Sequence, residues 1–208
     1  MKKTFFLAIT AMFATFSFFS CQSKGEGQTM SIQQILEQRH AVRAYTNEPV
    51  GDDVVMDILW AANGVSRKDG RRTAPSAVNA QDIDLYVCTE EGAFKYIPQP
   101  AALEKVTDRD IRPLFMAQNE YMKQAPLSIL LVSDQTKFGE PRPGSRNLYF
   151  GFIDAGLVSE NISLYCTAIG LGTVCCGPRM EIEEIQKALG LSEQHIPIVY
   201  HPIGYPAE

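Results

Sequence analysis

The sequence lacks the glycine-rich motifs with which the commonest nucleotide-binding folds hold a phosphate. Neither G-x-G-x-x-G nor the P-loop pattern G-x-x-x-x-G-K-[ST] occurs among its 208 residues. Both motifs wrap backbone N–H groups around a phosphate at the start of a helix. A Rossmann nicotinamide domain and a P-loop domain are therefore disfavoured.

Residues for hydrolytic or metal chemistry are also scarce. Ser76 has no G-x-S-x-G context, and no closely spaced pair of carboxylates points to glycoside hydrolysis. The three histidines, His40, His195 and His201, form neither a triad pattern nor a spaced ligand set with the cysteines. We expect no metal centre.

Strong positive charge is absent too. The formal net charge is −5, which gives no electrostatic footprint for nucleic acid. Past residue 30, no segment is long and apolar enough to span a membrane, and no internal repeat is visible.

The first twenty residues are typical of a secretory signal peptide. Two lysines precede an apolar run over residues 5–19, and Cys21 follows at once. This pattern fits a bacterial lipoprotein signal with Cys21 lipidated, followed by a flexible tether over residues 21–30. Phe18 stands where the strict lipobox has leucine, so an ordinary signal with an incidental cysteine stays open. We expect an exported, cell-envelope protein, lipid-anchored through Cys21, with one domain at residues 31–208 and, without the two signal lysines, a net charge of −7.

The other four cysteines fall into two kinds. Cys88 and Cys166 lie in apolar stretches and are expected to be small buried residues. Cys175 and Cys176 are neighbours and do not form a C-x-x-C redox pair, although export makes disulfides possible.

Hydrophobic periodicity and turn residues predict an alternation of helices and strands. The predicted helices cover residues 31–38, 52–62, 110–124, 147–169 and 181–189. The predicted strands cover residues 83–88, 94–96, 127–132, 173–176 and 198–203. Pro202 suggests a bulge or an edge in the last strand. This order indicates a single α+β or α/β domain.

The longest predicted helix, residues 147–169, carries almost no charge. Asp154 and Glu160 are its only acids, and it has no lysine or arginine. A helix that is apolar nearly all round is buried in a core or at a subunit interface.

Three groups of residues are candidates for ligand binding. Arg39 and Arg43 lie at i and i+4, on one face if the first helix continues, and with His40 they could grip a phosphate, or they are a solvated helix end. The basic loop with Arg67, Arg71 and Arg72 adds to the same positive site or sits in solvent.

The other two groups follow later in the chain. Asn79 and Gln81 occupy alternate positions before a strand, so both side chains point to one side and could bind a polar ring, or are ordinary turn amides. Gly170, Gly172 and Gly177 let backbone approach a ligand or cap a helix.

Four ordered segments resemble the nitroreductase family of FMN-dependent oxidoreductases, over about residues 31–206. They are residues 39–43 (RHAVR), 74–81 (APSAVNAQ), 154–173 with its Gly-Leu-Gly exit, and 203–206 (IGYP). Residues 59–64 and 72–77 also resemble the branch that includes azoline dehydrogenases, which work inside cells with partner cyclases. Ala41 stands where the family usually has serine, and the basic residues that many members carry after Gly-Tyr-Pro are not seen before Glu208.

The resemblance implies an α+β fold with a mainly antiparallel central sheet flanked by helices. It implies a homodimer with two FMN sites at the interface, each built from both chains. Arg39, His40 and Arg43 would bind the phosphate. Asn79 and Gln81 would bind the flavin ring or ribityl chain, while Cys176 and Gly177 would present backbone near the ring.

In this reading hydride passes from a donor such as NAD(P)H to a quinone, nitroaromatic or enone by a ping-pong cycle, and no residue is assigned as catalytic acid or base. An exported protein meets no ready pool of NAD(P)H. The alternative is therefore a flavin- or ligand-binding lipoprotein without turnover, and a structural interaction domain is a third possibility.

Overall fold

The computed structural model describes residues 30–116, 124–140, 146–177 and 179–207. The predicted signal peptide, Cys21 and nearly all of the tether lie outside these residues. Residues 117–123 of the helix predicted at 110–124 also lie outside them, and the described part holds a short helix at Pro113–Met116.

A single antiparallel sheet forms the centre of the molecule. Its six strands follow the order β3-β2-β1-β4-β6-β5, and every neighbouring pair is antiparallel. The strands are β1 (Ile83–Thr89), β2 (Gly92–Pro98), β3 (Ala101–Thr107), β4 (Leu127–Asp134), β5 (Gly172–Thr173) and β6 (His195–Gly204). The predicted α+β fold with a mainly antiparallel sheet is confirmed.

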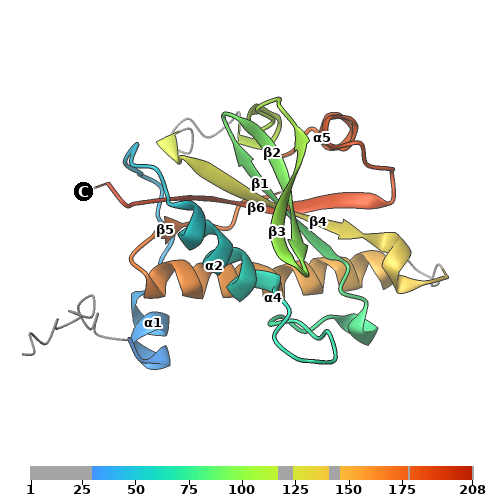
Figure 1. The fold of residues 1–208 in the computed structure, drawn as a ribbon, viewed down its shortest axis with the longest axis horizontal. Coiled ribbons are helices and arrows are strands. Elements are labelled where there is room, and N and C mark those ends of the chain that lie inside the picture. The colour runs from blue at the N-terminus through green and yellow to red at the C-terminus, as the bar shows by residue number, and fades with distance from the viewer. Residues whose placement is uncertain (1–29, 117–123, 141–145, 178, 208) are drawn as a thin grey trace, which may run out of the picture.

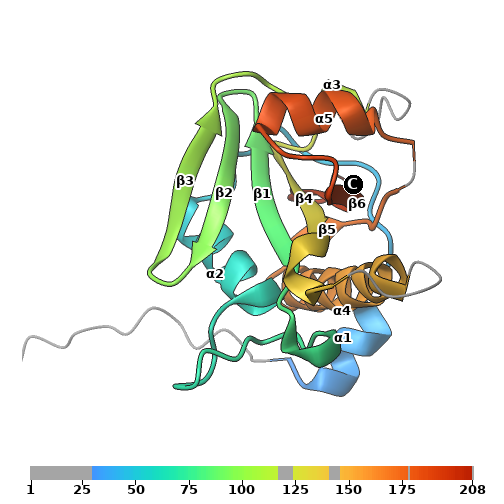
Figure 2. The same ribbon diagram turned by 90° about the vertical axis from the view of Figure 1, so that its right-hand side faces the viewer.

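Helices cover both sides of this sheet. They are α1 (Ile32–Gln38), α2 (Asp52–Asn63), α3 (Pro113–Met116), α4 (Arg146–Ala168) and α5 (Ile182–Leu189), with short 3-10 turns η1 (Ala77–Asn79) and η3 (Gln135–Phe138). In Figures 1 and 2, α2 and α4 lie on one side of β6, and α5 lies on the opposite side.

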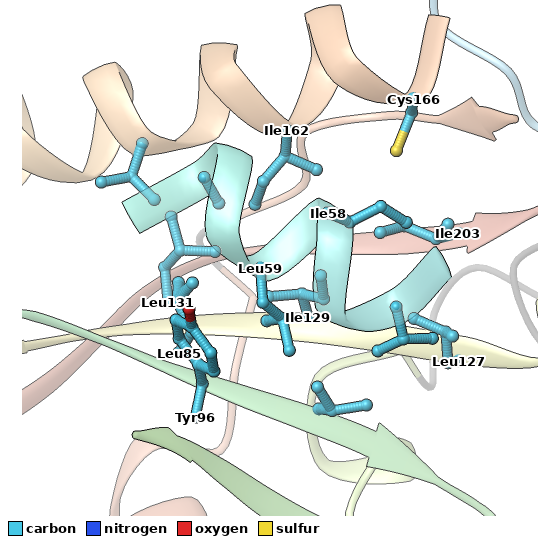
Figure 3. Packing of buried hydrophobic residues seen from close by; sticks show 14 of the residues in the cluster. Ile58, Leu59, Leu85, Tyr96, Leu127, Ile129, Leu131, Ile162, Cys166 and Ile203 are labelled. Atoms are coloured by element: carbon cyan, nitrogen blue, oxygen red, sulfur yellow. The ribbon is translucent and has the colours of Figure 1, made fainter. Parts of the chain in front are cut away.

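Alternation along the strands divides the core into two clusters. Leu85, Ile129 and Leu131 pack with Ile58 of α2 and Ile162 of α4, as Figure 3 shows. The intervening residues of the same strands pack on the other face with α3 and α5. Both faces of the sheet are thus buried, which explains why β1 and β4 read as nearly continuous apolar runs.

The first helix is shorter than the spacing of its arginines requires. Ser31 caps α1 through a capping box with Gln34, and the helix ends at Gln38. Arg39 has ψ 120°, so the chain from Arg39 to Arg43 is not helical. The condition for a shared helical face of the two arginines, a helix that continues past Gln38, is therefore not met.

The long helix α4 is buried on one side only. Ala155, Val158 and Ile162 face the core, whereas a row of large apolar side chains on the other side is exposed. That row, the α4 outer face, consists of Tyr149, Phe152, Ile153 and Leu157, which are 40–62% exposed.

The last strand is internal rather than an edge. β6 pairs with β4 along its length and with β5 at Ile203 and Gly204. The predicted bulge occurs earlier than Pro202: the register shifts opposite Leu131 and Val132, so Ile198 is the extra residue. Of the strand predicted at 173–176, only Thr173 belongs to β5, although Cys176 forms an isolated bridge to Tyr200.

Edge strand β3 was not predicted from the sequence. Its central residues Glu104 and Lys105 are exposed, so the strand shows no apolar face. Cys88 and Cys166 are fully buried as predicted, and burial raises the pKa of both thiols. Among the described helices, none has the length and apolar character needed to cross a bilayer.

Candidate functional site

The segment from Arg39 to Arg43 is fixed to the sheet by its main chain. The N–H of Val42 donates to the carbonyl of Thr173 in β5 at 3.0 Å. Val42 also packs directly on Gly172, where an added Cβ would lie 2.6 Å from Val42 Cγ1. Glycine is required at 172 by this close approach of the Val42 side chain, not by a helix cap.

The cationic side chains of this segment are exposed. Arg39 Nε lies 3.9 Å from Glu160 Oε1, and both side chains are about half exposed, 41% and 54%. His40 Nδ1 is 2.8 Å from the carbonyl of Gln38. Surface pairs of this kind contribute little to stability, so these side chains can bind a ligand instead without loss of stability.

Arg43 lies beside the second of the paired cysteines. Burial raises the pKa of Cys176 to about 11, and the Arg43 guanidinium opposes that rise. Cys175 is exposed, whereas Cys176 packs against the cluster around Tyr200. The two thiols thus face different surroundings. Arg39, His40, Arg43, Cys176 and Gly177 form one end of the predicted site, which we call the arginine half-site.

The backbone of Cys176 is already hydrogen-bonded within the protein, which conflicts with its predicted role beside the flavin ring. Its N–H and its carbonyl both hydrogen-bond to Tyr200, at 2.9 and 2.8 Å. Gly177 is exposed, and an added Cβ there would lie 3.1 Å from the carbonyl oxygen of Ile198. A cofactor contact through backbone at this bend therefore falls to Gly177.

The buried, neutral His201 is hydrogen-bonded to Thr173 of β5. The Thr173 hydroxyl donates to the carbonyl of Pro202 at 2.9 Å, so it accepts from His201 Nδ1 at 3.0 Å. His201 Nε2 is then the acceptor for the Ser159 hydroxyl, at 2.8 Å. Burial lowers the pKa of His201 to about 3, which keeps the ring neutral. This chain of bonds joins α4 to β5, the strand to which the N–H of Val42 donates.

The turn from Ser76 to Gln81 forms the other end of the predicted site, the turn half-site. Val78, Asn79 and Gln81 all have left-handed backbone, with φ of 51°, 56° and 51°. Such values are uncommon for residues other than glycine and need outside support. The Ser76 hydroxyl oxygen supplies part of it by accepting from the N–H of Gln81 at 2.8 Å.

The two amide side chains lie on one side, but not because they enter a strand. Gln81 Nε2 donates to Asn79 Oδ1 at 3.4 Å and to the carbonyl of Gly70 at 3.1 Å. Arg72 Nε donates to Gln81 Oε1 at 3.2 Å. Gln81 is thus largely engaged by the protein itself, and the exposed Asn79 is the amide better placed for a ligand.

The three arginines of the basic loop separate in the structure. Arg72 is bound to Gln81 and belongs to the turn half-site. Arg71 pairs with Asp69 at 3.3 Å, and both it and Arg67 are exposed in the loop. The loop therefore contributes one arginine, Arg72, and it lies in the turn half-site and not beside Arg39.

Sequence patterns missed the acids that hold this turn. Asp154 of α4 accepts the N–H of Ala77 with both carboxylate oxygens, at 3.1 and 2.9 Å. Asp84 binds Lys95 and Lys137 at 2.7 and 2.9 Å. Burial alone would raise the pKa of Asp84, but these two ammonium groups hold it below its ordinary value. A usable signal existed: Asp154 is one of only two acids in an otherwise uncharged helix.

Within one chain the two half-sites lie apart along α4. The turn half-site is bonded to Asp154 in the first half of the helix, whereas Val42 is bonded to β5, beyond its C-terminal end. From Asp154 to Glu160, the partner of Arg39, the helix rises about 9 Å, and from Asp154 to its end at Ala168 it rises about 21 Å. Figure 1 shows the same separation, with α1 beneath the C-terminal end of α4. The other glycine of the exit, Gly170, has φ 78° and ends α4 as a left-handed cap.

The six-stranded antiparallel sheet with helices on both faces defines a nitroreductase-like α+β fold. A crystal structure of a protein from Ralstonia eutropha JMP134, assigned as a nitroreductase, matches with a TM-score of 0.78 and 29% identity. The match covers 89% of this chain and 88% of that one. The model of the Nitroreductase family matches residues 36–205, and the chain belongs to this family.

Two archaeal relatives agree with that assignment. A Methanocaldococcus jannaschii protein assigned as a nitroreductase is 27% identical over 190 residues, covering 87% of this chain and 94% of its own length. A Methanothermobacter thermautotrophicus protein assigned as an NADH dehydrogenase/NAD(P)H nitroreductase is 26% identical over 187 residues, covering 88% and 82%. Together with the family match, they support a general oxidoreductase role for this chain.

Proposed function

We propose that this protein is an FMN-dependent oxidoreductase that moves hydride from a reduced donor such as NAD(P)H to an electron-poor acceptor in a ping-pong cycle. A quinone, a nitroaromatic compound or an enone would serve as the acceptor. The arginine half-site carries the proposal: two exposed arginines and an exposed histidine lie on a segment that is hydrogen-bonded to β5. Exposed guanidinium groups on a fixed backbone suit a phosphate better than a neutral ligand.

The residues present fit FMN by the chemistry of their donors. Arg39, His40 and Arg43 would hold the phosphate, and Asn79 offers an exposed amide for the polar edge of the ring or the ribityl chain. Bound FMN would supply the hydride chemistry, so the protein needs no acid or base of its own. The task left to the chain is to hold the cofactor and orient it.

A second copy of the chain would complete the site. The α4 outer face is apolar and exposed, and burying Tyr149, Phe152, Ile153 and Leu157 against a partner removes that surface from water. In a two-fold pair with antiparallel α4 helices, the arginine half-site of one chain would lie near the turn half-site of the other. The separation of the half-sites along α4 supports a homodimer with two composite sites.

The cellular setting remains a separate proposal. A signal peptide at residues 1–20 and a lipid on Cys21 would hold the domain at the bacterial cell envelope. Metabolic labelling with a palmitate analogue tests this, and wild-type protein without label would exclude the lipid anchor. Similarity to the azoline dehydrogenase branch stays a prediction from residues 59–64 and 72–77.

The decisive experiment is a visible spectrum of residues 22–208 purified after expression with riboflavin. We expect the absorption of oxidised flavin and release of FMN on denaturation. Stopped-flow reduction of that flavin by NAD(P)H or a quinol distinguishes the enzyme from a flavin-binding lipoprotein without turnover. A colourless protein that also fails to bind added FMN would contradict the cofactor assignment.

A further inference from the structure

Two buried carboxyl groups meet directly beneath the turn half-site. Asp82, just before β1, is 0% exposed, and Asp154 of α4 is 2% exposed. Asp154 acts electrostatically on Asp82, and Ser133 Oγ, which is bonded to Asp82, lies against Gly151 of α4, about one turn before Asp154. Asp154 has both oxygens on the N–H of Ala77, so it binds the turn directly.

The hydrogen bonds around Asp82 decide which oxygen carries a proton. Gln135 Nε2 donates to the Ser133 hydroxyl oxygen at 2.7 Å, and that hydroxyl donates its one hydrogen to Asp82 Oδ2 at 2.5 Å. Asp82 Oδ2 is therefore an acceptor. Asp82 Oδ1 is fully buried and has no partner among the described residues. An unpaired buried carboxylate oxygen is costly, whereas a protonated one can donate.

The cations on the neighbouring elements are hydrogen-bonded or paired with groups other than Asp82. Arg72, from the loop after α2, lies near Asp82 but donates its Nε to Gln81. Lys137 of η3 and Lys95 of β2 are both paired with Asp84. Asp154 is the neighbouring carboxyl group that raises the pKa of Asp82.

We propose that Asp82 and Asp154 share one proton, carried on Asp82 Oδ1 and donated to the Asp154 carboxylate, and that this pair positions the turn half-site. In this arrangement the carboxylate of Asp154 accepts the N–H of Ala77, and the neutral carboxyl group of Asp82 donates a hydrogen bond to Asp154. The pair thereby supports the left-handed backbone of Val78, Asn79 and Gln81. Its relevance to the cofactor rests on the proposed function; the shared proton itself does not.

Electrostatics favour the same protonation. Burial raises the pKa of Asp82 to about 7, the adjacent Asp154 carboxyl adds to the rise, and the Ser133 hydroxyl opposes it. A carboxyl group whose pKa is raised on folding stabilises the folded state at low pH. That contribution is lost as pH rises through the folded value of about 7.

The test compares the pH dependence of unfolding in wild type, Asp82→Asn and Asp82→Ala. Asparagine can accept from Ser133 with its oxygen and donate to Asp154 with its nitrogen, but it cannot ionise. Between about pH 4 and pH 8, the folding equilibrium constant of wild type should fall, relative to that of Asp82→Asn, by up to roughly a thousandfold. Asp82→Ala should be less stable than Asp82→Asn throughout. Parallel wild-type and Asp82→Asn curves would overturn the shared proton.

A second measurement guards against a variant that fails to fold. Carbon-13 NMR of aspartate carboxyl groups in wild-type protein should show one buried carboxyl that titrates near neutral pH, and its absence would overturn the proposal. Neither readout requires bound flavin. If FMN does bind, its affinity should weaken above neutral pH in wild type and become less pH-dependent in Asp82→Asn. Equal pH dependence in the two proteins would remove the positioning role.

Discussion

The two half-sites beside α4 are held in different ways. The arginine half-site is fixed by main-chain bonds such as Val42 N–H to Thr173, so its charged side chains carry no part of the fold. The turn half-site is held by buried side chains, above all Asp154, and its own Gln81 is a structural member. Substitutions of the binding side chains in the arginine half-site should therefore change the stability of the fold little. Substitutions in the turn half-site disturb hydrogen bonds to buried side chains.

The largest expected effect comes from removing two cations of the arginine half-site. Arg39→Ala with Arg43→Ala should weaken FMN binding by about 4 kcal/mol, roughly a thousandfold, because two charge-assisted hydrogen bonds are lost. The measurement is flavin content after gel filtration. Arg67→Ala with Arg71→Ala is the matched control and should keep its flavin. Full flavin content in the first variant would remove Arg39 and Arg43 from the cofactor site.

A mixing experiment tests whether the two half-sites cooperate across chains. Arg39→Ala/Arg43→Ala protein and Asn79→Ala/Gln81→Ala protein should each bind little flavin alone. After unfolding and refolding together, random pairing should restore about a quarter of the sites, because each mixed dimer has one intact composite site. Flavin bound per chain, measured by absorbance, reports the outcome. No recovery, despite formation of mixed dimers, would contradict a site shared between chains.

A smaller effect should follow from disturbing the main-chain support of the arginine half-site. In Gly172→Ala the new Cβ would lie within 2.6 Å of Val42 Cγ1, so β5 and residues 39–43 must move apart. Overpacking of this kind costs about 2 kcal/mol of the free energy of unfolding, measured in urea. Adding Val42→Ala should recover part of the loss. If the double variant is no more stable than Gly172→Ala, the contact is not the cause.

The smallest effect is expected beneath β5. Thr173→Val removes the acceptor for His201 Nδ1–H and should cost about 1 kcal/mol of unfolding free energy. Thr167→Val is the control, since that hydroxyl bonds only to Ser163 within α4. Both are compared near pH 7. His201, whose pKa is lowered to about 3, contributes fully there and loses its contribution only as pH falls from about 6.5 towards 3.

Local patterns predicted the regular elements better than the site. β1 and β4 were found because nearly continuous apolar runs match strands buried on both faces, and α5 because its pattern is amphipathic. The end of α1 at Gln38 agrees with the predicted helix, whereas the spacing of Arg39 and Arg43 did not show whether the helix continues past that residue. β3 was missed because an edge strand needs no apolar face.

The turn half-site shows why side-chain geometry escaped the sequence. Asn79 and Gln81 look like residues entering a strand, yet the chain at 78–81 is left-handed, at residues without the freedom of glycine. What imposes that backbone is Asp154, 77 positions after Ala77, together with Ser76. A contact over that separation leaves no local periodicity to read. The separation of the half-sites within one chain was likewise invisible without the length and direction of α4.

The fixed length of α4 also limits how its sequence can vary. Inserting a single residue between Asp154 and Ala168 would turn everything beyond it by about 100° and advance it by about 1.5 Å. The α4 outer face would then be split between two directions, and β5 would leave its place beside Val42. Seven residues, close to two full turns, would nearly restore the rotation while moving the half-sites about 10 Å further apart. Length changes in this family should therefore be rare inside this helix and gather in the loops that flank it.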